Sequence, residues 1–163
     1  MDSFESFYRR NVRLVAALAR SRSAQTEQAE DLTQETFLRA WRHYRDLEGL
    51  EAPAQRAWLV RTARNLATDA WRRRALEAEA MPPAAESGSR QAETDLRLDV
   101  AQALAQLDAD DRELVVMRYL EEMNSREIGE ALGVPEGTVR RRLSECRDRL
   151  AQHLTQWAPQ GAR

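Results

Sequence analysis

The sequence predicts an all-α protein of two small helical domains joined by a flexible linker, the C-terminal domain being a helix-turn-helix. Three observations predict this. Apolar residues recur every three or four positions over most of the 163 residues, and no stretch alternates as a β-strand would. Residues 77–95 carry Pro, Ser and Gly but almost no large apolar side chain. Residues 124–150 read as a short helix, a glycine turn and a second helix.

The charges divide the chain in the same way. All 25 basic residues are arginine, and 27 acidic residues bring the formal net charge to −2, which gives no global signal for nucleic acid or membrane. Residues 1–76 carry 14 Arg against 10 acids (+4), residues 77–95 carry 1 against 5 (−4), and residues 96–163 carry 10 against 12 (−2). We therefore expect an N-terminal domain at 1–76, an acidic linker at 77–95 and a C-terminal domain at 96–163.

Several function classes are disfavoured. One cysteine and two histidines far apart argue against a disulfide framework and a metal site, and no nucleophile–base pair or carboxylate pair indicates an enzyme or a cofactor. The first residues are acidic and no apolar run approaches the roughly 18 residues of a membrane span, so we expect a cytoplasmic protein without membrane insertion.

The first domain contains three apolar stripes at helical spacing. Between the second and third, Gly49 and Pro53 indicate a loop within residues 46–53. The stripes are Phe4, Phe7, Tyr8, Asn11, Val15 and Leu18; Leu32, Thr36, Phe37, Ala40 and Tyr44; and Leu59, Ala63, Leu66, Ala67 and Ala70.

Residues 56–74 form the most basic part of this domain, with six arginines and one acid. The side of the helix opposite the apolar stripe carries Arg61, Arg64, Asn65, Thr68 and Arg72. Trp58 and Trp71 lie among these residues, and rings beside a basic track suit stacking on single-stranded bases. Core packing of Trp58 is an equally good interpretation.

The predicted helix that contains Phe37 begins with several acidic residues. The acids there favour the helix dipole, which explains them without any function. Alternatively, a protein-docking face is formed by Asp31, Gln34, Glu35, Leu38 and Trp41.

In the second domain we expect helices at 96–107 and from Asp108, an N-cap, to Leu120. Asn124 and Glu127 predict a capping box, and Gly133 the end of that short helix. The next helix places Val139, Leu143, Cys146 and Leu150 on one buried stripe, where Cys146 is a core residue rather than a redox switch.

The opposite side of that helix predicts base and phosphate contacts in a DNA major groove. Its candidate residues are Glu136, Gly137, Thr138, Arg140, Arg141 and Arg142. A solvated basic face on an ordinary helical hairpin is the alternative.

Three segments in this order resemble bacterial RNA polymerase sigma factors of the extracytoplasmic-function (ECF) class of the sigma-70 family. Residues 31–41 (DLTQETFLRAW) resemble the polymerase-binding segment, residues 56–69 (RAWLVRTARNLATD) the −10 promoter helix, and residues 107–150 the −35-binding domain. The chain departs from the family pattern at Ser144 and Glu145, where basic residues or histidine are common.

The resemblance implies a non-enzymatic subunit that directs transcription initiation. Asp31, Gln34 and Glu35 would dock on the clamp of core RNA polymerase, with the flap region as a second contact. Residues 56–72 with Trp58 would engage the −10 element, residues 46–53 would capture a flipped base, and residues 136–142 would read the −35 element. The acidic linker would thread the RNA channel, and an anti-sigma protein would hold the chain inactive.

Other classes are a sigma-like decoy that binds an anti-sigma protein but not DNA, a plain helix-turn-helix repressor, and an enzyme. The arginines on both helices disfavour the decoy, and the acidic docking face disfavours the repressor.

Overall fold

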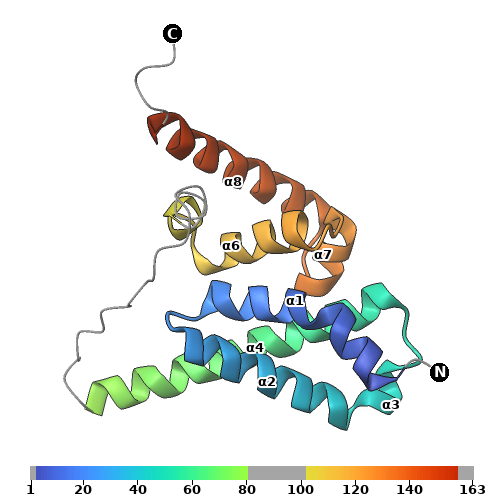
Figure 1. Cartoon of the computed structure of the whole chain (residues 1–163). Helices are drawn as coiled ribbons and strands as arrows, with labels where there is room; N and C mark the ends of the chain where they lie inside the picture. The colour runs from blue at the N-terminus through green and yellow to red at the C-terminus, as the bar shows by residue number, and fades with distance from the viewer. Residues whose placement is uncertain (1–2, 81–101, 158–163) are drawn as a thin grey trace.

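The computed structural model describes residues 3–80 and 102–157, which are helical nearly throughout and contain no strand. The first lobe consists of α1 (Phe4–Arg22), α2 (Thr26–Arg42), α3 (Tyr44–Leu47) and α4 (Ala52–Ala80), and the second of α6 (Ala109–Val115), the π-helical turn η1 (Val116–Leu120), α7 (Ser125–Leu132) and α8 (Glu136–Trp157). The prediction of an all-α fold with a C-terminal helix-turn-helix is confirmed (Figure 1).

Aromatic side chains build the core at one end of the first lobe. Phe7 is fully buried, and its ring meets Phe37 and Tyr44 edge-on at centroid distances of 6.5 and 5.6 Å. Asn11, the polar member of the predicted stripe, is also buried, because its side-chain amide donates a hydrogen bond of 2.8 Å to the Phe7 carbonyl. The polar interruption in the stripe is therefore satisfied within α1 itself.

The local signals of the second lobe are found where the sequence predicts them. Asp108 accepts a hydrogen bond from the Asp111 amide, and Asn124 and Glu127 form a complete capping box at the start of α7. Gly133 ends α7 in the left-handed region at φ 70°. Cys146 is fully buried on the inner stripe of α8. The cap residues therefore set the ends of these helices.

Gly129 sets the angle between α7 and α8. A Cβ atom at this position would lie 2.7 Å from the Val134 carbonyl oxygen and 3.5 Å from the Glu136 amide nitrogen. Both atoms belong to the backbone of the turn and of the first residue of α8, so they cannot rotate away. The absent side chain lets α8 start close against α7.

The structure corrects two boundaries. Helix α4 continues to Ala80, so the first four residues of the expected linker (77–95) are helical. Pro53 lies in the first turn of α4 and Asp46 lies in α3, so the expected loop at 46–53 is shorter than predicted. The rest of the linker and residues 96–101 of the expected helix lie outside the described residues.

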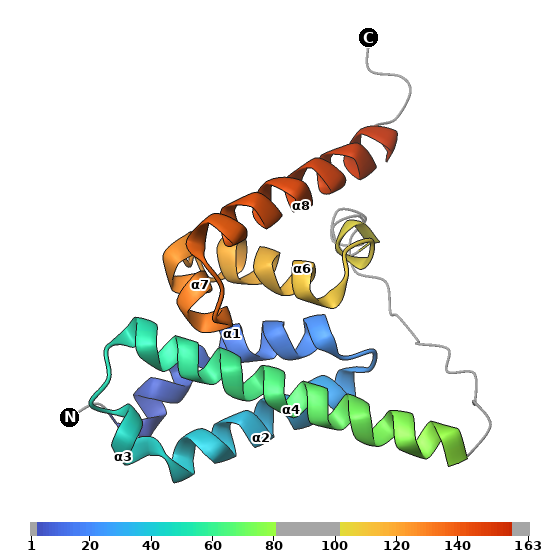
Figure 2. The ribbon, with the colours of Figure 1, turned by 180° about the vertical axis from the view of Figure 1, so that it is seen from behind.

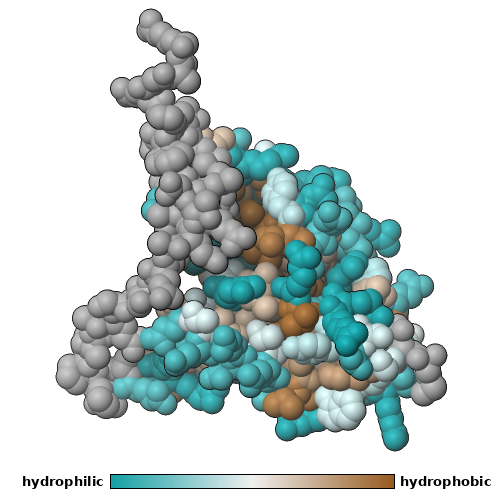
Figure 3. All heavy atoms as spheres, in the orientation of Figure 1, coloured by the Kyte–Doolittle hydropathy of each residue, from teal (hydrophilic) through white to brown (hydrophobic). Residues whose placement is uncertain are grey.

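The two lobes pack directly against each other. One continuous hydrophobic cluster joins Leu14, Leu18 and Val60 of the first lobe to Met117 and Ile128 of the second. Figures 1 and 2 show α6, η1 and α7 lying across α1 and α4, while α2 lies on the far side of the first lobe. In Figure 3, brown apolar surface marks this junction between the lobes. The sequence patterns carry no signal for this arrangement.

Gly129→Ala should lower the free energy of unfolding by about 2 kcal/mol, because the new methyl group would clash with fixed backbone. A glycine within a helix ordinarily gains about 1 kcal/mol on replacement by alanine, so the expected sign is reversed. Gly137→Ala is the matched control, since a Cβ atom added there would meet nothing within 4 Å. Urea titration followed by circular dichroism measures both, and equal effects would contradict the close approach.

Candidate nucleic-acid interface and docking surface

The predicted basic face of α4 divides into two parts. Arg61, Asn65, Thr68 and Arg72 are exposed along one side of the helix. Arg64 is half-buried and turns instead toward α6, where its guanidinium lies 3.5 Å from both Asp110 and Glu113. The exposed residues make weak local contacts at most, such as the 3.9 Å pair of Arg72 with Asp69. Four of the predicted α4 residues are thus accessible to DNA, and one is engaged by the second lobe.

The two tryptophans of α4 have different environments. Trp58 is half-buried, packs against the aromatic core of the first lobe and lies 6.0 Å from the His43 ring. Trp71 is 65% exposed and precedes three consecutive arginines, Arg72 to Arg74. The environment of Trp58 favours core packing, and Trp71 has the open ring face that stacking on a base requires.

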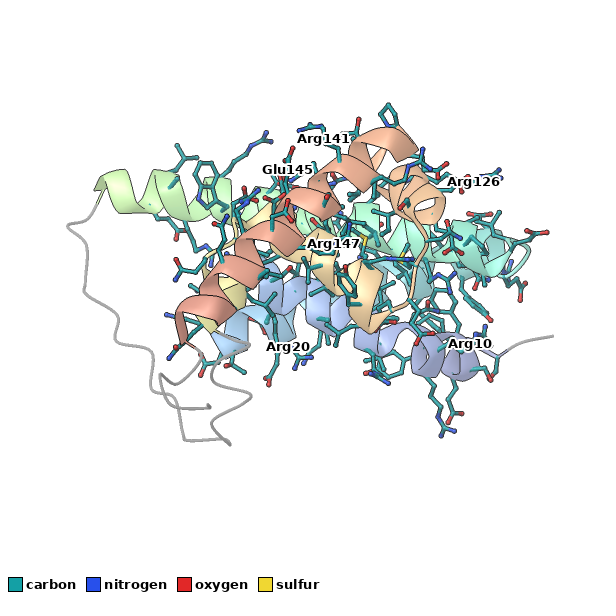
Figure 4. All side chains as sticks on the ribbon, turned by 90° about the horizontal axis from the view of Figure 1, so that it is seen from above. Arg10, Arg20, Arg126, Arg141, Glu145 and Arg147 are labelled. Carbon is teal, nitrogen blue, oxygen red and sulfur yellow. The ribbon has the colours of Figure 1, made fainter. Side chains whose placement is uncertain are left out.

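The start of α8 presents most of its predicted residues to solvent. Glu136, Gly137, Arg140 and Arg141 are exposed, and Thr138 is half-buried. Arg140 pairs with Glu136, and Arg141 with Glu145, each at 2.6 Å and each four residues apart on the helix. Figure 4 shows Arg141 and Glu145 side by side on α8. Exposed pairs of this kind are weak, so a phosphate or a base edge can replace the carboxylate.

Arg142 has a different environment from its neighbours. Its guanidinium donates to one carboxylate oxygen of buried Asp111 at 2.6 and 3.1 Å, while Arg149 donates to the other oxygen at 2.8 Å. Burial opposes the charged form of Arg142, but the hydrogen bond and the charge of Asp111 outweigh it and raise the pKa of the guanidinium. This contact favours a structural role: Asp111 fixes the rotation of α8 on α6. Sequence reasoning missed this role of Asp111.

The predicted docking face lies on α2. Asp31, Gln34, Leu38 and Trp41 are exposed, and Glu35 is half-buried and pairs with Arg39 at 3.2 Å. Leu38 is 51% and Trp41 62% exposed, although the Trp41 ring rests edge-on against Phe4 at 4.8 Å. Acidic and apolar groups thus share α2, and this helix lies on the side of the first lobe away from the second (Figure 2). Beside this face, a cavity between α2 and α4 is lined by Asp31, Glu35, Arg73 and Arg74.

Carboxylates of the second lobe bind arginines of the first lobe. These contacts between the lobes were also not predicted from the sequence. Arg22 at the end of α1 pairs with Asp110 and with Glu113, whose side chain is only 1% exposed. Burial raises the pKa of Glu113, although Arg22 and Arg64 act in the opposite direction. Arg56 of α4 pairs with Glu127 of α7 at 2.9 Å. These contacts join positions 71 to 91 residues apart along the chain, so no local pattern reports them.

The only cysteine of the chain, Cys146, is buried. Burial raises the pKa of the Cys146 thiol to about 11, so the thiol is protonated at neutral pH. Within residues 3–80 and 102–157, no group of three or more His, Cys, Asp or Glu side chains could hold a metal ion. None of the helices described is long and apolar enough to cross a membrane.

Comparison with known proteins finds two matching family models. Sigma-70 region 2 matches residues 7–77, and Sigma-70, region 4 matches residues 103–152. The two matches are separated by residues 78–102 and include most of α4 and most of α8, respectively.

Curated relatives and solved structures agree with these models. The ECF RNA polymerase sigma factor SigE of Mycolicibacterium smegmatis is 36% identical over 97% of this chain, which spans 65% of the length of SigE. The ECF RNA polymerase sigma factor SigL of Mycobacterium tuberculosis is 39% identical to this chain. The aligned region covers 71% of this chain and 68% of the length of SigL. The sigma factor RpoE, solved with the anti-sigma factor NepR from Bartonella quintana, superposes with a TM-score of 0.73 at 27% identity, covering 93% of this chain and 96% of RpoE.

Arg142→Ala should destabilise the protein by about 2 kcal/mol, because it leaves the buried Asp111 carboxylate with Arg149 alone. Arg141→Ala should cost less than about 0.5 kcal/mol, because it removes only an exposed pair. Chemical unfolding of the two variants provides the comparison. Equal stabilities would show that the Asp111 contact does not hold α8.

Proposed function

The chain belongs to the sigma-70 family of RNA polymerase sigma factors, in the ECF class, and we propose from this that it binds core RNA polymerase and directs initiation at specific promoters. The observation that carries the proposal is the coexistence of two exposed basic helix faces, on α4 and α8, with a separate acidic and apolar face on α2. A repressor needs one such DNA-binding face and no docking face. The chain supplies contacts only, and the chemistry belongs to the polymerase in the cytoplasm.

The α2 face is the proposed contact with the polymerase clamp. Leu38 and Trp41 supply the exposed apolar area on which a protein interface is centred, and Asp31 and Gln34 supply its polar rim. The second lobe is the proposed contact with the flap region. An anti-sigma protein is the proposed regulator, because the similar sigma factor RpoE was solved in complex with one, NepR.

We propose that α4 engages the −10 element through Arg61, Asn65, Thr68 and Arg72, and that residues 46–53 receive a flipped base. Trp71 takes the stacking role considered for Trp58, because its ring is open to solvent and its arginine neighbours attract the backbone. On α8, Arg140 and Arg141 are the proposed −35 contacts together with Glu136, Gly137 and Thr138. Arg142 acts there by positioning the helix.

A sigma-like decoy remains the second candidate, since it would keep the fold and an anti-sigma surface. The two exposed arginine faces favour the sigma factor, because a decoy that does not bind DNA does not need basic surfaces. DNA binding therefore discriminates between the two functions.

Mixed with purified core RNA polymerase, the chain should co-elute on size-exclusion chromatography and support promoter-dependent transcription. Leu38→Ala combined with Trp41→Ala should abolish co-elution, because it removes the apolar centre of the docking face. Leu50→Ala, another exposed apolar residue, is the control and should leave co-elution intact. A wild-type chain that elutes apart from core would refute the sigma-factor function.

Trp71→Ala should weaken binding of the holoenzyme to single-stranded non-template DNA by about 5- to 100-fold, the loss expected for one stacked base. Trp71→Phe should retain most of the affinity, because the ring face remains. Trp58→Phe, in the core, should leave DNA affinity unchanged. Fluorescence anisotropy measures all three, and a Trp71→Ala variant with wild-type affinity would remove Trp71 from the interface.

A further inference from the structure

The cavity between α2 and α4 combines apolar lining with charged residues. The two helices lie side by side in the first lobe (Figures 1 and 2). The cavity has a volume of about 360 Å³, at the small end of the range for ligand pockets. Its apolar lining consists of Leu32 of α2, which is 9% exposed, and Leu66 of α4, which is 6% exposed, with Ala67 and Ala70. The cavity can therefore hold a small ligand with an apolar body.

Charges of opposite sign enter the cavity from opposite helices. Asp31 and Glu35 come from α2, whereas Arg73 and Arg74 come from α4. The α2 side of the cavity thus offers carboxylates, and the α4 side offers guanidinium groups.

These opposing charges do not pair with each other. Among the described residues, Asp31 and Arg73 make no hydrogen bond and no ion pair. Glu35 pairs with an arginine of its own helix. Arg74 reaches α2, but it donates to the neutral side-chain oxygen of Gln28. A carboxylate and a guanidinium without protein partners therefore line one cavity from its two sides.

The other two charged residues of the lining leave this picture unchanged. Arg22 is held by Asp110 and Glu113 of the second lobe. Glu77 is exposed and lies one turn past Arg73 on α4. With these two, the lining carries three arginines and three acidic residues, so its formal charge is zero. A polyanion such as a nucleotide phosphate needs an excess of cations, which this cavity lacks.

We propose that the cavity binds a small zwitterion of the amino-acid type with an apolar side chain, and that this ligand competes with polymerase for α2. The ligand carboxylate pairs with Arg73, its ammonium group pairs with Asp31, and its side chain covers the apolar lining. The binding site rests on the cavity alone. The competition rests on the proposed sigma-factor function, because Asp31 also belongs to the docking face.

The unpaired charges select a zwitterion over other small molecules. A simple cation leaves Arg73 without a partner, a simple anion leaves Asp31 without one, and a neutral molecule leaves both. One carboxylate and one ammonium group on the same molecule satisfy the two residues together. A free amino acid and a dipeptide share this chemistry and differ in the distance between their charges, so the two are compared directly.

The test is isothermal titration of the full chain with leucine and with leucyl-leucine. At least one of them should bind saturably. N-acetylleucine lacks the ammonium group and leucinamide lacks the carboxylate, so each should bind about fivefold or more weakly than leucine, the loss expected for one partly exposed ion pair. N-acetylated and C-amidated leucyl-leucine provide the same comparison for the dipeptide.

Two variants with matched controls locate the site. Asp31→Asn should weaken binding about fivefold, whereas Glu30→Gln, at an exposed position of α2 outside the cavity lining, should leave it unchanged. Ala70→Leu should abolish binding by filling the cavity. Ala54→Leu makes the same change at an exposed position of α4 and should bind as the wild type does. Circular dichroism checks that each variant is folded.

The competition is read by co-elution with core polymerase. Saturating ligand should reduce co-elution of the wild-type chain and leave that of Ala70→Leu unchanged. Co-elution that saturating ligand does not alter would overturn the competition. A chain that binds the ligand but elutes apart from core without ligand would refute the sigma-factor function and leave the binding site standing.

Other results would overturn the binding site itself. These are no binding of either zwitterion up to about 10 mM, equal binding of the analogues that lack one charge, or cavity variants that bind as their controls do. Loss of co-elution by Ala70→Leu, with no binding of either zwitterion, would assign the cavity to a side chain of the polymerase instead.

Discussion

The short acidic helix α6 organises the molecule, because carboxylates on it bind arginines of three other helices. Asp111 binds Arg142 and Arg149, two turns apart on α8, and so sets the orientation of the helix proposed to read DNA. Two residues later, Glu113 binds Arg22 at the end of α1 and lies near Arg64 of α4. Both carboxylates are buried, where an unpaired charge costs far more than at the surface. The orientation of α8 within its lobe and the packing of one lobe on the other therefore depend on two carboxylates within one turn of a single helix.

The use of arginine alone suits this organisation. At Asp111, one guanidinium donates two hydrogen bonds to a single oxygen while a second guanidinium binds the other oxygen, which a lysine ammonium could not reproduce with the same planarity. The same fork geometry fits phosphates and base edges, which are the proposed partners of the exposed faces of α4 and α8. Burial distinguishes the two environments of arginine on α8: Arg142 pairs with buried Asp111, whereas Arg141 beside it pairs with an exposed glutamate.

Local features were predictable from sequence, and long-range charge pairs were not. Helical spacing, the Asn124–Glu127 capping box, the turn at Gly133 and the buried Cys146 follow from interactions within a few residues, which sequence patterns record. The family resemblance was also readable, because its motifs are local. The role of Arg142 could not be predicted, since its partner lies 31 residues away and the other arginines of the helix show the same local pattern. The contacts between the lobes could not be predicted from sequence for the same reason. The choice between Trp58 and Trp71 required knowledge of how far each side chain is buried.

Burial of the single thiol limits which stimuli the chain itself can sense. Oxidants and electrophiles react with thiolates that they can reach, whereas Cys146 is enclosed beneath α8 and stays protonated with a pKa of about 11. The only cysteine in the sequence is therefore poorly suited to sense peroxide or disulfide stress.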